Sequence, residues 1–276
     1  MGLYVTSNVA ALNAYRNLSM TQSSQNSSLE KLSSGYRINR AADDAAGLAI
    51  SQGLQAQIGG LQVAVTNAQD AISVVQTADG ALTETQSILL RMRNLAVQAA
   101  NGGSQDTQAQ AASQTEFSQL QSELDRISSS TKFGNQNLLD GTYTGTFQIG
   151  ANAGETINVD LTGSKMDSAT LGVDSGTINV GDTASAAASI SAIDTAIQSV
   201  STTRATLGAY QNRFQHTVNN LNVAVENLTA SNSRIQSTDM ASEMVKFTSA
   251  QILSQAGTAM LAQANQQPQS ILKLLQ

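Results

Sequence analysis

The 276-residue sequence has no cysteine, no tryptophan, one proline and one histidine, and only 12% of its residues are charged. Without cysteine, the chain forms no disulfide bond and no thiolate metal site. The single histidine, His216, leaves a catalytic triad or a zinc site to be built from carboxylates, which is a poor set of groups for either. Aromatic residues make up only 4% of the chain, so few large side chains are available for a deep globular core. This composition argues against a compact enzyme.

Charge and hydropathy disfavour two further classes of partner. The formal net charge is −6 and no cluster of lysine and arginine occurs, so we expect no nucleic acid partner. No apolar stretch reaches the roughly 18 residues of a membrane span, and the N-terminus lacks the basic and apolar regions of an ordinary secretory signal. We also expect neither a cofactor nor a metal ion. Long helices are favoured, because Pro268 is the only proline and an interior proline costs a helix about 3 kcal/mol.

The clearest pattern is an apolar residue at every seventh position, first between residues 54 and 89 and again between residues 193 and 235. A heptad pattern sustained in this way predicts coiled-coil-like helices. A shorter apolar stripe between residues 117 and 127 predicts a third helix, and "NGGSQD" (101–106) separates it from the first. We expect a mainly α fold, with a long antiparallel helical rod. Its predicted core residues are Leu54, Leu61, Val75, Leu82, Val200, Leu207, Phe214, Leu221, Leu228 and Ile235.

The composition and the apolar pattern of the sequence change in the middle and at the two ends of the chain. Between about 141 and 181 the sequence is rich in glycine and has short alternating patterns, which predicts a small β-hairpin region. Residues 1–31 and 248–276 carry scattered apolar side chains among glutamine, asparagine, serine and alanine. Neither apolar stripe is large enough to order a helix alone, so we expect both terminal helices to become ordered on assembly.

A charged cluster stands out in "LSSGYRINRAADDAAGLAIS" (32–51), with Arg37, Arg40, Asp43 and Asp44 following Gly35. Neighbouring residues on a helix point about 100° apart, so the two aspartates do not converge on one metal ion. The two arginines, three residues apart, can share one face and reach nearby acids. We therefore predict an ion-paired turn, with both aspartates in the first turn of a helix that spans residues 45–100, where the helix dipole favours anions.

Several long segments resemble bacterial flagellin. They include "LEKLSSGYRINRAADDAAGLAIS" (29–51), "SELDRISSSTKFGNQNLLDG" (122–141) and "SRIQSTDMASEMVKFTSAQILSQAGTAMLAQANQQPQSILKLLQ" (233–276). The resemblance implies a structural subunit, not an enzyme, that polymerises with itself into the helical flagellar filament used for swimming. It also implies export in an unfolded state through the flagellar export channel to an extracellular location. Implied partners are a flagellar export chaperone, the filament cap, hook-junction proteins and a vertebrate flagellin-sensing Toll-like receptor.

The same resemblance implies a division of the chain. Residues 1–45 and 236–276 are expected to be filament-core segments, residues 46–190 to hold rod helices and the β region, and residues 191–235 to form the C-terminal rod helix. Gly35, Arg37, Arg40, Asp43 and Asp44 are expected to form a joint that contacts neighbouring subunits. The receptor surface of the family maps onto Arg91, Leu95 and Glu123, although Asn94 stands where many recognised members have glutamate.

Two other functions are alternatives to a filament subunit: a junction or hook-associated protein, and an enzyme. A junction or hook-associated protein would share flagellin-like ends but would match less closely between residues 29 and 51. An enzyme carried on the same scaffold would need a cluster of acidic, basic or metal-binding residues between residues 141 and 190, and the sequence of that segment shows no such cluster.

Overall fold

The computed structural model describes residues 8–101, 106–176 and 178–274, with residues 267–274 described as backbone only. In these ranges the chain is mainly α-helical, with five helices and two small antiparallel sheets, as the sequence predicts. The chain forms two compact units: Met1–Ala56 together with Asn227–Gln276, and Gln57–Glu226. No helix in the described ranges is both long enough and apolar enough to cross a membrane.

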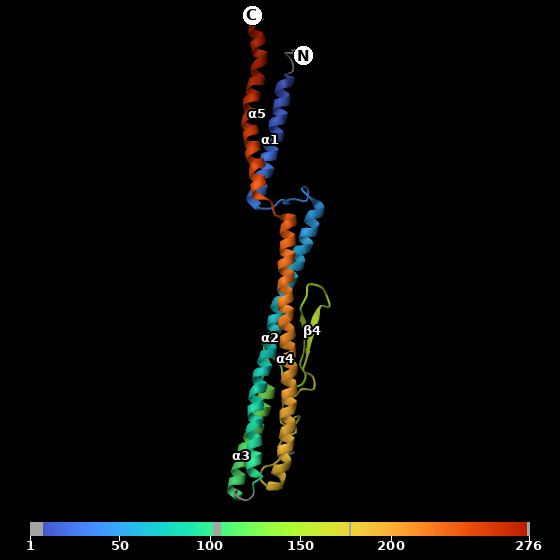
Figure 1. Ribbon diagram of the computed structural model, residues 1–276, viewed down its shortest axis with the longest axis vertical. Helices are drawn as coiled ribbons and strands as arrows, with labels where there is room; N and C mark the ends of the chain where they lie inside the picture. Colours follow the sequence, from blue (N-terminus) through green and yellow to red (C-terminus); the bar gives the residue numbers. More distant parts are fainter. Residues whose placement is uncertain (1–7, 102–105, 177, 275–276) are drawn as a thin grey trace. The chain divides into compact units, whose positions relative to one another are not determined.

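Three helices lie side by side in the unit Gln57–Glu226 (Figure 1). They are α2 (Ala45–Ala99), α3 (Thr107–Ser130) and α4 (Thr183–Gln236), of which α2 and α4 also contribute to the other unit. Two ion pairs show that α2 and α4 run antiparallel: Arg204 Nε lies 2.8 Å from Asp79 Oδ1, and Arg93 Nε lies 2.6 Å from Asp194 Oδ1. Helix α2 ends at Ala99 and α3 begins at Thr107, which confirms the predicted break at residues 101–106. Residues 102–105 of this break lie outside the described ranges.

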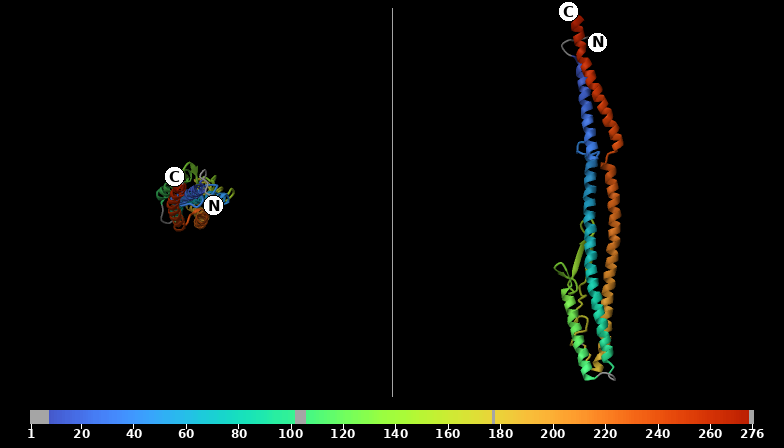
Figure 2. Two further views of the ribbon diagram at one scale, coloured as in Figure 1. Left: turned by 90° about the horizontal axis from the view of Figure 1, so that it is seen from above. Right: turned by 90° about the vertical axis from the view of Figure 1, so that its left-hand side faces the viewer.

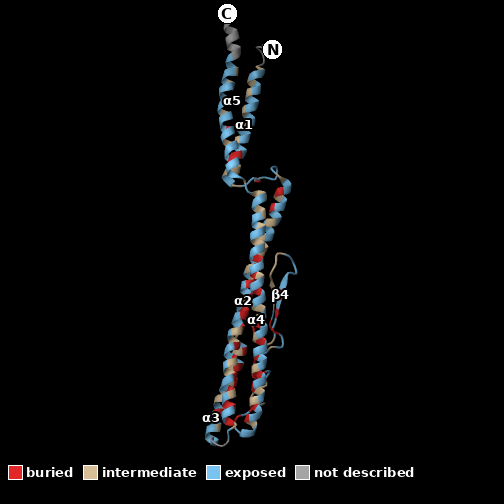
Figure 3. Ribbon diagram, viewed as in Figure 1, coloured by how far each residue is buried: buried red, intermediate tan, exposed pale blue. Residues whose placement is uncertain are grey.

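The predicted heptad residues form much of the core of this unit. Val75, Leu82, Val200, Leu207, Phe214 and Leu221 are buried, whereas Leu54, Leu61, Leu228 and Ile235 are only half-buried. The buried cluster is built jointly by α2, α3, α4 and the segments after α3, and the four half-buried residues lie outside it. Two paired helices shield only one side of each other, so burial is complete only where a third element covers the pair. Figure 3 shows the buried residues in red.

Ile197, Val218 and Val225 form a second apolar stripe along α4, four residues after the first, and Arg204 interrupts it. Hydrogen bonds accommodate this arginine. Its Nε donates to Asp79, and its Nη1 donates to Gln86 Oε1 at 2.7 Å. A charged hydrogen bond of this kind offsets the cost of moving the guanidinium partly out of water. The packing of α4 against α2 therefore continues past this charged residue.

The β region is smaller than predicted. Strands β3 (Thr144–Gln148) and β4 (Thr156–Asp160) pair antiparallel, and β1 (Lys132–Phe133) pairs with β2 (Gln136–Asn137). The β3–β4 hairpin lies against the helices (Figure 2), where Asn67 Nδ2 donates to Gln148 O at 3.0 Å. Phe147 of β3 meets Phe214 of α4 edge to face, with ring centroids 5.7 Å apart.

The segment after β4 corrects two predicted boundaries. The described residues between 161 and 182 form no strand, although they bury several apolar side chains, among them Val173 and Val180. Helix α4 begins at Thr183 and not at 191. Asp182 accounts for the earlier start, because its Oδ1 accepts a hydrogen bond from Ala184 N and its Oδ2 accepts one from Ser185 Oγ.

In the other unit, α1 (Val9–Ser34) and α5 (Met240–Leu274) pack side by side and antiparallel. Asn8 Nδ2 donates to Ala264 O at 2.8 Å near one end of the pair, and Ser28 Oγ donates to Glu243 Oε1 at 2.7 Å near the other. Between them the helices approach closely, since a Cβ added at Gly257 would lie 3.2 Å from Leu18 Cδ1. Both terminal segments are thus helical here, and ordering only on assembly stays a prediction.

Candidate functional site

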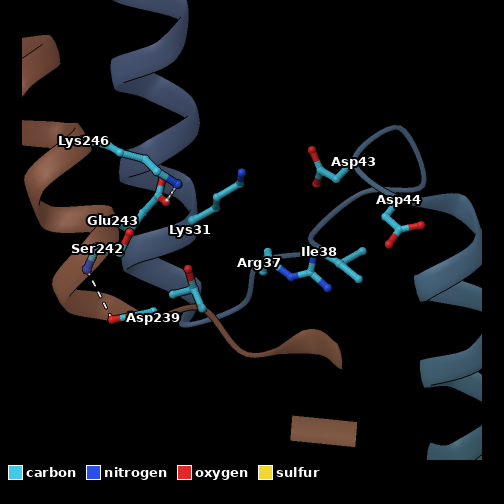
Figure 4. Close-up of a pocket in the computed structure, with 10 residues that line it drawn as sticks. Lys31, Arg37, Ile38, Asp43, Asp44, Asp239, Ser242, Glu243 and Lys246 are labelled. Atoms are coloured by element: carbon cyan, nitrogen blue, oxygen red, sulfur yellow. Dashed lines mark hydrogen bonds and ion pairs between the residues drawn. The ribbon is translucent and has the colours of Figure 1, made fainter. Parts of the chain in front are cut away.

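The charged cluster lies in a loop, residues 35–44, that is hydrogen-bonded to the linker between α4 and α5. Gly35, at φ 73°, ends α1 in the left-handed conformation, which glycine adopts without strain. Arg37 N donates to Gln236 O at 2.7 Å, and Thr238 N donates to Gly35 O at 3.0 Å. The Arg37 side chain adds a third link, because its Nη2 donates to Ile235 O at 2.7 Å. We call residues 35–44 and 235–239 the junction (Figure 4).

Both aspartates precede α2, which begins at Ala45, so they do not lie in its first turn as predicted, and both accept hydrogen bonds from backbone N–H groups. Asp44 Oδ1 accepts from Gly47 N at 2.8 Å, as an N-cap residue does. Asp43 Oδ2 accepts from Arg40 N at 2.9 Å and from Asn39 N at 3.1 Å, and these hydrogen bonds lower the pKa of Asp43. Both carboxylates therefore shape the backbone of the loop.

The predicted ion pairing involves only one of the two arginines. Arg40 Nε lies 2.9 Å from Glu30 Oε1, with the Arg40 side chain 71% and the Glu30 side chain 40% exposed, and Arg37 binds the backbone as described above. Asp43 and Asp44 are not the ion-pair partners of either arginine. An exposed pair such as Arg40–Glu30 contributes about 0–1 kcal/mol to stability, so it is not what holds the loop in place.

An apolar anchor, missed from the sequence, holds the loop. Ile38 is only 2% exposed, although charged and polar residues surround it in the sequence. Gly47 lies directly beneath it: an added Cβ would overlap the Asp44 carboxylate and lie 2.8 Å from Ile38 Cδ1. The path of the loop therefore depends on a buried isoleucine and on a glycine that leaves room for it.

A buried carboxylate beside the junction links α1 to α5, and the sequence reasoning missed it as well. Glu243 is 5% exposed, and it accepts from Ser28 Oγ at 2.7 Å and from Lys246 Nζ at 3.0 Å. The Ser28 hydrogen bond is the main reason why the pKa of Glu243 is lowered; burial opposes the shift, and Lys246 adds to it. The carboxylate borders a cavity of about 320 Å³ that is also lined by Lys31 and Asp239 (Figure 4).

Helices α1 and α5 expose many large apolar side chains. The shielded positions of α5, apolar or not, recur every three or four residues between 243 and 264 and form the seam with α1. At 100° per residue, Met244, Ile252 and Met260 lie on three different sides of α5 outside this seam. A helix that is apolar all round is normally buried. The exposed set is Val9, Leu12, Tyr15, Met20 and Leu29 on α1, and Met240, Met244, Val245, Ile252, Leu253 and Met260 on α5.

The three residues of the expected receptor surface have different environments. Arg91 of α2 is exposed, and its Nη2 lies 2.6 Å from Glu116 Oε1 on α3. Glu123 of α3 pairs with Arg126 at 2.5 Å. Leu95 is only 3% exposed and belongs to the core. Arg91 and Glu123 are therefore accessible in the described structure, and Leu95 is not.

No group of three or more metal-ligating side chains occurs among the described residues, and His216 is exposed on α4. The notable features are instead unpartnered apolar helix surfaces and a backbone junction between helices. Such surfaces bind other protein surfaces and carry out no chemistry. Fold and site together define a helical protein whose exposed apolar surfaces suit contacts with other protein surfaces.

Comparison with known proteins identifies the family. Residues 5–144 match the bacterial flagellin N-terminal helical region, and residues 190–275 match the C-terminal helical region. The chain is 50% identical over 274 residues to flagellin of Halalkalibacterium halodurans, covering 99% of this chain and 100% of the relative. It is 49% identical over 301 residues to Bacillus subtilis flagellin, covering 98% and 99%. The chain belongs to the bacterial flagellin family.

A solved structure agrees with this assignment. The crystal structure of Bacillus cereus flagellin matches with a TM-score of 0.50 and 36% identity, covering 56% of this chain and 88% of that one. Flagellins are structural proteins, and this chain is accordingly not an enzyme.

Proposed function

We propose that the chain is the structural subunit of a bacterial flagellar filament and that copies of it polymerise through the exposed apolar surfaces of α1 and α5. The observation that supports this most strongly is the distribution of apolar side chains around α5. Outside its seam with α1, the helix exposes large apolar side chains on several sides. A contact between unlike surfaces that does not close into a ring generates a helical fibre. The full-length match to flagellins supports the same function.

The energetics favour assembly over an isolated subunit. Fully burying one large apolar side chain contributes about 1.5–3 kcal/mol, and eleven such side chains are exposed among the side chains of α1 and α5 that the structure describes. Their burial would contribute on the order of 10 kcal/mol or more, which is opposed by the entropy lost on association and on ordering the helices. Folding of the terminal helices and polymerisation are therefore coupled, so each promotes the other.

Removing residues 248–276 tests the proposal. Purified truncated chain should fail to elongate filament seeds, because most of α5 is lost, while circular dichroism should still report a cooperative helical transition from unit Gln57–Glu226. A full-length variant with Ile252→Ser and Leu253→Ser, both exposed on α5, should elongate seeds poorly for the same reason. Normal elongation by both variants would contradict the proposed surface.

Membership of the flagellin family supports a proposal for the steps before assembly. The chain leaves the cell unfolded through the flagellar export channel, and an export chaperone holds its C-terminal segment beforehand. Outside the cell it adds beneath the filament cap, and the first subunits meet hook-junction proteins. Retention of the chain inside cells that lack the flagellar export apparatus, with secretion from matched normal cells, is the expected result. Equal secretion from both would contradict export by this route.

The junction is also part of the proposal, as a joint that contacts neighbouring subunits. Arg40 and Glu30 are exposed and contribute little to the subunit itself, so their charges are available for such contacts. Arg40→Glu should change the elongation rate or the filament form while the urea unfolding curve stays unchanged. Filaments indistinguishable from those of the natural chain would exclude Arg40 from the contact.

Recognition by a flagellin-sensing Toll-like receptor completes the proposal. Arg91 and Glu123 supply its exposed charges, and Leu95 supports the α2 backbone beneath them from the core. Arg91→Ala should lower the response of reporter cells that carry the receptor, because a charged group of the surface is removed. An undiminished response would exclude Arg91.

A further inference from the structure

Methionines are distributed unevenly between the two units. Among the described residues, the unit that contains α1 and α5 has only exposed methionines: Met20, Met240, Met244 and Met260 are 47–64% exposed. The unit Gln57–Glu226 has only buried ones, since Met92 is 0% and Met166 is 3% exposed. Among the described residues, the methionines open to solvent therefore lie on the two helices that we assign to polymerisation.

We propose that these four exposed methionines are an oxidative modification site that controls polymerisation. The oxidant is a peroxide such as hydrogen peroxide. Its terminal oxygen is transferred to the thioether sulfur, the O–O bond breaks, an S=O bond forms and water leaves. The sulfur is thereby oxidised by two electrons and the peroxide oxygen is reduced. The product is a polar, chiral sulfoxide in place of a flexible apolar side chain.

The effect on polymerisation follows from burial, and this inference rests on the proposed function of α1 and α5. A thioether gains from transfer out of water, whereas a buried S=O group needs a hydrogen-bond donor. A sulfoxide buried against the exposed apolar side chains of a neighbouring copy is therefore left unpaired. One such unpaired acceptor shifts an equilibrium by about tenfold. Oxidation of the free subunit should therefore raise the critical concentration for polymerisation by about tenfold or more.

Burial also makes the site self-protecting. Methionine sulfur that is packed against a neighbouring subunit is inaccessible to peroxide, as Met92 and Met166 are in the subunit core. Free subunits should thus be sensitive to oxidation and assembled filaments resistant. Methionine sulfoxide reductases of both stereospecificities, with dithiothreitol as the electron donor, reverse the reaction: the dithiol becomes a disulfide, the sulfoxide returns to thioether and water leaves.

The test treats purified full-length subunit with hydrogen peroxide, confirms the sulfoxides by peptide mass spectrometry and measures the critical concentration of seeded polymerisation by sedimentation. We expect a rise of about tenfold or more, which reductase treatment reverses. If the untreated chain fails to polymerise, both the proposed function and this inference fall. If the untreated chain polymerises and the chain oxidised at all four sites does so equally well, only this inference falls.

Two variants locate the effect, each compared with its own untreated sample. A variant with leucine at Met20, Met240, Met244 and Met260 should lose the response to peroxide, and a variant with Met92→Leu and Met166→Leu should keep it. A full response in the first variant would overturn the inference. Should that variant not polymerise, oxidation rates decide: the four sulfoxides should form at least about tenfold more slowly in filaments of the natural chain than in free subunits, and equal rates would overturn it.

Discussion

Replacing Glu243 by alanine is expected to impair polymerisation strongly, because the carboxylate of Glu243 joins α5 to α1. Glu243 is 5% exposed and accepts a hydrogen bond from Ser28, which is 6% exposed. Alanine would leave the Ser28 hydroxyl buried without its charged acceptor. Hydrogen bonds to charged groups contribute about 1.5–3 kcal/mol. The bond to Lys246, whose side chain is 64% exposed, contributes little more.

This loss has a direct consequence for assembly. If α1 and α5 must pair for a subunit to join the filament, a loss of 1.5–3 kcal/mol corresponds to a critical concentration raised roughly 10- to 150-fold. Glu243→Gln keeps an acceptor oxygen for Ser28 and should raise the critical concentration much less. The urea unfolding transition of unit Gln57–Glu226 should change by less than about 0.5 kcal/mol, because Glu243 is not part of that unit.

A double-mutant cycle separates this hydrogen bond from other effects of the substitution. Critical concentrations are measured by sedimentation for the natural chain, Glu243→Ala, Ser28→Ala and the combined variant. We expect a coupling free energy of about 1 kcal/mol or more between the two positions. An unchanged critical concentration in Glu243→Ala, or a coupling of zero, would refute the argument that this bond joins α1 to α5.

Three further predictions concern acid, the junction and the core. The pKa of Glu243 lies below the 4.5 of an ordinary glutamate, so its stabilisation is complete above pH 4.5 and is lost as the pH falls through its folded-state pKa. The critical concentration should therefore rise in acid, with a smaller rise in Glu243→Gln; identical curves would implicate other groups. Gly47→Ala should destabilise the junction by about 1–3 kcal/mol and speed its cleavage in limited proteolysis, because the added Cβ meets Ile38 and Asp44. Its control Gly53→Ala, where an added Cβ meets nothing within 4 Å, should not be cleaved faster. Phe214→Ala should lower the free energy of urea unfolding by about 3–5 kcal/mol, and a loss below about 1 kcal/mol would contradict its place in the core.

The sequence was a good guide wherever a regular period determines burial. The step of seven places Leu82, Leu207 and Phe214 in the core because one face of each helix meets neighbouring elements along its length. It overstated burial at Leu54 and Ile235, because a heptad pattern does not report whether a third element covers the pair.

The β region and the helix ends were harder to predict, for two physical reasons. Apolar residues after β4, such as Val173, are buried through turns: its N–H donates to Ser168 O at 2.8 Å, outside any strand ladder. The start of α4, which the sequence analysis placed at residue 191, is set by the side chain of Asp182. A single capping residue moves a boundary without changing the apolar period.

The junction shows where sequence reasoning stops. Its charged residues are conspicuous in the sequence, but the contacts that hold it join residues about two hundred positions apart, such as Arg37 and Ile235. Nothing in the local pattern predicts that Ile38 is buried or that Glu243 lies against Ser28. Such contacts form because α5 packs back along α1 in the folded chain, and the local sequence carries no sign of this pairing.

The most direct test of this account is a cryo-electron microscopy map of filaments grown from the purified chain. We predict that the apolar side chains exposed on α1 and α5 of the subunit, among them Leu12, Met244 and Ile252, are buried against neighbouring copies. Filaments in which these side chains face solvent, or a purified chain that does not elongate seeds at all, would contradict polymerisation through these two helices.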